Sequence, residues 1–214
     1  MYIYIYVLNI MIIQLVEFTS FAYILFRLIN ECTTHRAMDY TRAIFTLTFA
    51  SYWIYSMHRY QHKYPDGVFG KIHAMHHNPK HKNEWYSYVL EGLNNSQLLL
   101  FILFNNLLKK MTNVELFSNY ILVLLTVMYL FVHFIQYKVV KSCKHAIHHE
   151  HDDDVIQNYE LIKNYDPDIF DKLFETKSYC ITDQTPWYLS VLVILVRTYI
   201  LYYVTVAICK KIHK

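Results

Sequence analysis

Histidine is the residue whose number and spacing stand out in this sequence, because eight of its thirteen histidines fall into three short patterns. One pattern is HxxxH and two are HxxHH, and they comprise His58, His62, His73, His76, His77, His145, His148 and His149. On a helix, residues three and four positions apart lie on one face, so each pattern can aim two imidazoles at a common point. Imidazole is the commonest side-chain metal ligand and suits iron, copper, zinc and nickel. The spacing therefore predicts a metal site.

Eight imidazoles are more than one metal ion needs, so this number favours a site with two ions. His133 is a ninth candidate ligand, since it lies near the end of an apolar run, where an imidazole without a function is costly. His35, His81 and His213 stand outside the patterns, and we expect them to be ordinary surface or hydrogen-bonded residues.

Other metal and cofactor chemistries fit the sequence poorly. It contains no HExxH motif of zinc proteases and no ExxH motif of carboxylate-bridged di-iron bundles. Its four cysteines form no CxxC pair, and neither GxGxxG nor a P-loop occurs. The imidazoles are thus expected to act as metal ligands, and no separate catalytic acid or base is indicated.

The elements that must position these histidines are apolar. Of the 214 residues, 55% are hydrophobic and 17% are charged. Five apolar runs cover residues 3–29, 43–57, 95–108, 114–137 and 187–209. About 20 apolar residues cross a bilayer core as a helix, so run 3–29 can span it, whereas run 95–108 is short for a full crossing. We predict an all-α integral membrane bundle of four to five apolar helices with a helical, histidine-rich metal domain.

Charge indicates which way the bundle is oriented. The net charge of +3 comes from scattered lysines and arginines, which argues against a nucleic-acid partner. The polar segments that carry the histidines hold most of these cations, and the positive-inside tendency therefore puts the histidines on the cytosolic side. Residues 187–209 can span the membrane or lie in its interface. Glu17 is expected to face other helices, because a carboxylate is costly in lipid.

At this point the sequence resembles the fatty acid hydroxylase/sterol desaturase superfamily of integral-membrane, histidine-box di-iron oxygenases. The resemblance covers about residues 43–177 and rests on the three histidine patterns in order. Farther along, Asn158-Tyr159 and residues 171–176 resemble the family's NY and D-[RK]-[IL]-F-G-T segments, with Glu175 where glycine is usual.

The resemblance implies an organisation and an activity. It divides the chain into an N-terminal membrane helix and loop (1–42), a hydroxylase/desaturase-like domain (43–177) and a C-terminal membrane or interfacial helix (178–214). It implies two iron ions, O2 as co-substrate, and hydroxylation or desaturation of a lipid, with a sterol-like lipid favoured and a sphingoid base or fatty acyl chain next. Electrons would come from a partner such as cytochrome b5 and its reductase, and the location would be the endoplasmic reticulum or a derived membrane.

Two other functions stay open at this point. One is a membrane metal-binding or metal-transport protein, although transporters place their ligands in the middle of membrane spans, whereas the histidine patterns here lie at the ends of apolar runs. The other is a catalytically silent relative of the family, chiefly because of Glu175.

Overall fold

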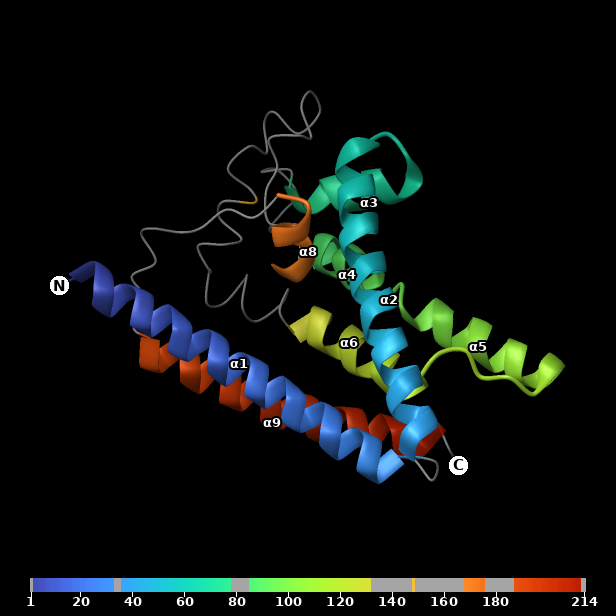
Figure 1. Cartoon of the computed structure of the whole chain (residues 1–214). Coiled ribbons are helices and arrows are strands. Elements are labelled where there is room, and N and C mark those ends of the chain that lie inside the picture. The colour runs from blue at the N-terminus through green and yellow to red at the C-terminus, as the bar shows by residue number, and fades with distance from the viewer. Residues whose placement is uncertain are drawn as a thin grey trace.

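The computed structural model describes residues 2–32, 36–77, 85–131, 148, 168–175 and 187–212. These residues contain helices and turns and no strand (Figure 1), which confirms the all-α fold class. The helices are α1 (Tyr2–Cys32), α2 (Arg36–Lys63), α3 (Val68–His77), α4 (Trp85–Asn95), α5 (Leu99–Thr112), α6 (Asn119–Phe131), α8 (Asp168–Leu173) and α9 (Trp187–Ile212).

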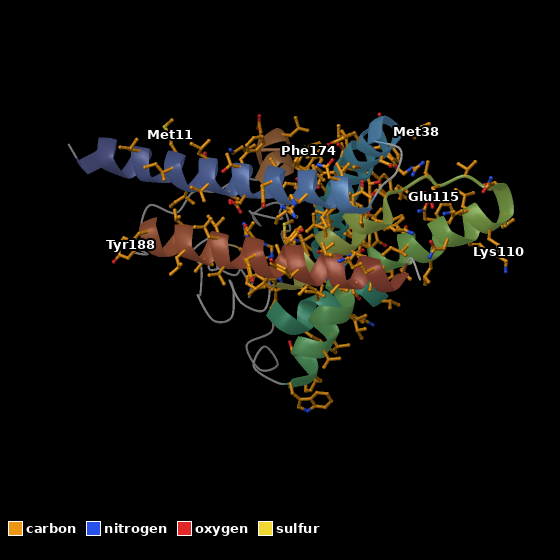
Figure 2. The ribbon with its side chains drawn as sticks, turned by 90° about the horizontal axis from the view of Figure 1, so that it is seen from below. Met11, Met38, Lys110, Glu115, Phe174 and Tyr188 are labelled. Carbon is orange, nitrogen blue, oxygen red and sulfur yellow. The ribbon has the colours of Figure 1, made fainter. Side chains whose placement is uncertain are left out.

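Helices α1 and α9 contain the two described stretches that are long and apolar enough to cross a membrane, Met11–Asn30 and Val191–Ile208. They pack side by side and run in the same direction along the chain (Figure 1). Met11 on α1 and Tyr188 on α9 point outward (Figure 2) and are exposed. Such apolar outer surfaces suit acyl chains. By length and composition these two helices can cross a membrane, whereas the number of four to five apolar helices remains a prediction.

Polar contacts join these two helices within their apolar stretches. The guanidinium Nη2 of Arg197 donates to Glu17 Oε1 at 2.8 Å. Ten residues farther along α1 and five farther along α9, Arg27 Nη2 donates to the Tyr202 hydroxyl at 3.1 Å. Glu17 therefore contacts a neighbouring helix, as expected for a carboxylate at membrane depth.

Helix α6 forms the centre of the bundle, because residues 120–126 are all buried. A helix that is apolar all round is buried on every side, and α6 packs against α2, α5 and α9. Aromatic rings fill the space between α2 and α5: Phe101 meets Phe49 and Trp53 edge to face, with centroids 5.3 and 5.1 Å away.

The loop between α5 and α6 is built around Asn105, which is 1% exposed. Its Oδ1 accepts from the N–H groups of Leu116 and Phe117 at 2.8 and 2.9 Å, and its Nδ2 donates to the carbonyl of Phe117 at 2.8 Å. These bonds explain why the predicted apolar run 114–137 begins as a loop, with the helix starting only at Asn119.

Ion pairs and hydrogen bonds fix the α5–α6 hairpin along α2. The loop is held at the start of α2 by Arg42, whose Nη1 lies 3.0 Å from Glu115 Oε2. The turn before α5 is held nearer the other end, because Trp53 Nε1 donates to Gln97 Oε1 at 3.0 Å. At about 1.5 Å of rise per residue, His58 lies about 24 Å beyond Arg42 along α2. The histidines therefore lie at one end of the bundle and the Arg42–Glu115 pair at the other.

Candidate metal centre

The last turns of α2 supply the first two imidazoles. His58 and His62 are four positions apart on this helix, so they lie on the same face, and their ring centroids are 5.2 Å apart. His62 is 2% exposed. The long helix α2 thus delivers both side chains directly to the end of the bundle.

A tight turn after α2 reverses the chain and positions α3. The N–H of Tyr64 donates to the Tyr60 carbonyl at 2.9 Å, and the N–H of Gly67 donates to the Tyr64 carbonyl at 3.1 Å. Gly70 packs onto this turn so closely that a Cβ there would lie 2.0 Å from the Tyr64 oxygen. Only glycine fits at that distance, and its absent side chain lets α3 fold back onto α2.

The folded-back α3 brings His73 and His77, one helical turn apart, against the α2 pair. The Nε2 atoms of His73 and His62 are 2.9 Å apart, and those of His77 and His73 are 3.2 Å apart. His148, far along the chain, completes the group: its Nε2 lies 3.1 Å from that of His58 and 3.2 Å from that of His62.

Five imidazoles therefore converge, and one ligand nitrogen from each lies within 4.8 Å of all the others. All but His58 are buried. In the described part of the chain, this is the one group of three or more potential ligands close enough to share a metal ion.

The converging nitrogens fit a bound cation. A neutral imidazole has one N–H donor and one lone pair, so several Nε2 atoms facing a common point must oppose either protons or lone pairs. A metal ion removes that conflict. Neighbouring Nε2 atoms lie 2.9–3.2 Å apart, which is close enough for them to bind the same ion.

The structure describes the side chains of only five of the nine predicted ligands. It brings together His58, His62, His73, His77 and His148. His76 lies on α3, but its side chain is outside the described part, and His133, His145 and His149 lie outside the described residues altogether. The role of all nine as metal ligands stays a prediction, as does the number of ions.

An amide pair beside the histidines was not predicted. Gln61 Nε2 donates to Asn94 Oδ1 at 2.5 Å, and Asn94 Nδ2 donates back to Gln61 Oε1 at 3.4 Å. Gln61 is 2% exposed and precedes His62, so the pair ties α4 to the metal-binding end of α2. Its position between His58 and His62 was the available signal, because a glutamine inside an HxxxH pattern lies beside the ligand face.

Helix α8 covers another side of α2 near the histidines. Phe174 stacks on Tyr55 with a centroid distance of 5.2 Å, and Asp171 is fully buried. Glu175, directly after this helix, has a φ of 59°. Glycine adopts that left-handed conformation without steric cost, which explains why glycine is usual there. Asn158-Tyr159 lies outside the described residues.

These features define a class of protein: an all-helical membrane protein with a buried histidine cluster that could hold a metal ion at the end of its bundle. The model of the fatty acid hydroxylase family matches residues 43–176, and the chain belongs to this family. Its matched part contains all three histidine patterns and excludes α1 and α9. No curated protein and no solved structure shows significant similarity to the chain. Family and cluster together indicate a function of the membrane lipid hydroxylase or desaturase type.

Proposed function

We propose that this protein is a membrane-bound, non-haem di-iron oxidoreductase that uses O2 to hydroxylate or desaturate a lipid. The observation that carries the proposal is the convergence of five imidazoles from two helices and a distant residue of the chain. Family membership supports iron as the metal and a lipid as the substrate. A sterol-like lipid is the favoured substrate, with a sphingoid base or a fatty acyl chain next.

The proposed ligands among the described residues are the five clustered histidines. His58, His62, His73, His77 and His148 would hold the iron, which when bound would supply the activation of O2 that oxidation of an unactivated C–H bond requires. The four remaining predicted ligands would complete the coordination of a second ion; they are His76, His133, His145 and His149. Burial of four of the five clustered imidazoles excludes most water from their nitrogens and limits loss of the metal to solvent.

The electron donor, the membrane and the orientation of the protein belong to the same proposal. The sequence contains no nucleotide-binding loop, so we propose that electrons come from an external donor such as cytochrome b5 and its reductase. The positive-inside tendency favours a cytosolic orientation of the histidines, in the endoplasmic reticulum or a membrane derived from it. The domain division 1–42, 43–177 and 178–214 belongs to the same proposal, with α1 and α9 as additions to the family core.

Metal analysis of the purified protein, combined with O2 consumption in the presence of lipid, tests this function. We expect about two irons per chain, lipid-dependent O2 uptake, and an oxidised lipid in cells that express the protein. Bound iron without O2 uptake would instead identify a catalytically silent relative. A chain that binds no iron but carries zinc or copper across vesicle membranes would be a transporter, and the proposal would fail.

A further inference from the structure

An apolar groove of about 770 Å³ lies between helices of the bundle. Its walls come from five helices: α3, α4, α5, α6 and α9 contribute, among others, Ile72, Leu93, Leu103, Val127 and Ile208. This volume lies in the range of about 300–1,000 Å³ that is usual for sites holding one small molecule. The groove therefore suits a single hydrocarbon body.

The polar residues of the groove come mainly from one short segment of the chain. Asn94, Ser96 and Gln97 belong to the end of α4 and the turn that follows. Thr126 is the other polar lining residue, and its hydroxyl donates to the Leu122 carbonyl at 2.8 Å. Among the described lining residues none is charged.

Two lining residues connect the groove to the helices that carry the histidines. Ile72 in the groove wall directly precedes His73 on α3. Asn94 forms the amide pair with Gln61, which directly precedes His62 on α2. A molecule in the groove therefore contacts residues of α3 and α4 that are linked to the imidazoles.

We propose that the groove binds an uncharged lipid that has one apolar body and a small polar group such as a hydroxyl. Burying an ion without a counter-charge costs far more than burying a hydroxyl with a hydrogen-bond partner. Gln97 Oε1 already accepts from Trp53 and Asn94 is paired with Gln61, but each amide has a second N–H and a second lone pair for a further hydrogen bond. A sterol and a long-chain alcohol share this chemistry. The inference rests on the proposed function in taking this lipid as the substrate, and it puts sterol-like lipids ahead of free fatty acids and protonated sphingoid bases.

Binding of three ligands with the same chain tests the charge requirement. Hexadecanol, palmitate and hexadecylamine differ only in their head group, and their binding to the full-length protein in phosphatidylcholine nanodiscs is measured against empty nanodiscs. We expect hexadecanol to bind at least tenfold more tightly than either ion, and cholesterol competition shows whether a sterol takes the same site. Equal binding of palmitate or hexadecylamine overturns the proposal.

Two matched tryptophan variants test the location. Leu103 lines the groove, whereas Leu107, one turn farther along α5 and also exposed, does not. Leu103→Trp should weaken hexadecanol binding at least tenfold and Leu107→Trp should leave it unchanged; equal effects of the two contradict the assignment. Ser96→Lys should shift the preference toward palmitate. Because binding is read without iron or turnover, a negative result leaves the di-iron proposal standing, and absence of iron leaves the groove standing.

Discussion

The Nε2 atoms of His58 and His148 lie 3.1 Å apart, although 90 residues separate them along the chain. An Nε2 atom of a neutral ring carries either a proton or a lone pair, so one such atom facing two others cannot be satisfied by simple hydrogen bonds, whereas a cation bound between the rings would satisfy all three. His148 also lies 3.2 Å from His62, so it links both histidines of α2 to the third histidine pattern.

Replacing His148 should therefore weaken metal binding more than it disturbs the fold. We expect His148→Ala to bind iron at least about tenfold more weakly while still inserting into membranes, as measured by metal analysis after dialysis against a chelator. His213→Ala, which alters a histidine outside the three patterns, is the control. Equal iron retention in both variants would remove His148 from the ligand set.

Gly70 should be indispensable to the cluster. A Cβ at this position meets the Tyr64 carbonyl at 2.0 Å and Pro65 Cα at 2.8 Å, and backbone atoms cannot yield cheaply. Gly70→Ala should thus push α3 off α2, destabilise the protein by about 1–3 kcal/mol and release iron. At Gly67 the corresponding contact is 3.3 Å, so Gly67→Ala should keep its metal; thermal unfolding and iron content measured together check both.

Glu175 holds a backbone conformation that glycine would hold at lower cost. A side chain in the left-handed region loses about 1–2 kcal/mol, part of which glycine gives back through its greater freedom in the unfolded chain. We expect Glu175→Gly to stabilise the protein by about 1 kcal/mol, seen as a higher midpoint of thermal unfolding. Glu175→Ala keeps the strain and removes only the carboxylate, so stabilisation by that variant would point to charge instead.

The Glu17–Arg197 pair should couple α1 to α9. Either single change, Glu17→Gln or Arg197→Gln, leaves a charge in an apolar stretch without its partner. The double variant should be less destabilised than the sum of the singles, with a coupling energy of about 1–3 kcal/mol in unfolding experiments in detergent micelles. Additive effects would mean that the two side chains do not interact in the membrane.

Asn105 should be essential to the α5–α6 loop, and its neighbour should not. Asn105→Leu removes the acceptor of the Leu116 and Phe117 N–H groups. The Phe117 N–H is buried and costs about 1–3 kcal/mol when unsatisfied, so the variant should lower the unfolding temperature markedly. Asn106 is exposed and accepts one bond from Asn119, so Asn106→Leu should stay within about 0.5 kcal/mol of the unaltered protein. Similar losses in the two variants would contradict this reading of the loop.

What the sequence by itself determined is local and compositional. The HxxxH and HxxHH spacings placed pairs of imidazoles on single helix faces, since helical periodicity depends only on near neighbours. Apolar runs of sufficient length predicted an all-α membrane protein, and order and spacing of the patterns were enough to point to the family. The helix boundaries were harder to predict. Residues 96–98, at the start of the predicted run 95–108, form a turn, and α5 begins only at Leu99.

Only the tertiary structure decided which distant residues meet. That His148 lies against His58, that Glu17 finds Arg197, and that Gln61 pairs with Asn94 all depend on how whole helices pack. The same holds for Gly70, whose necessity follows from a backbone contact across a turn, and for the groove, whose walls come from five helices. Packing between elements far apart in the chain leaves no periodic signal in a single sequence, which is why these features could not be predicted from it.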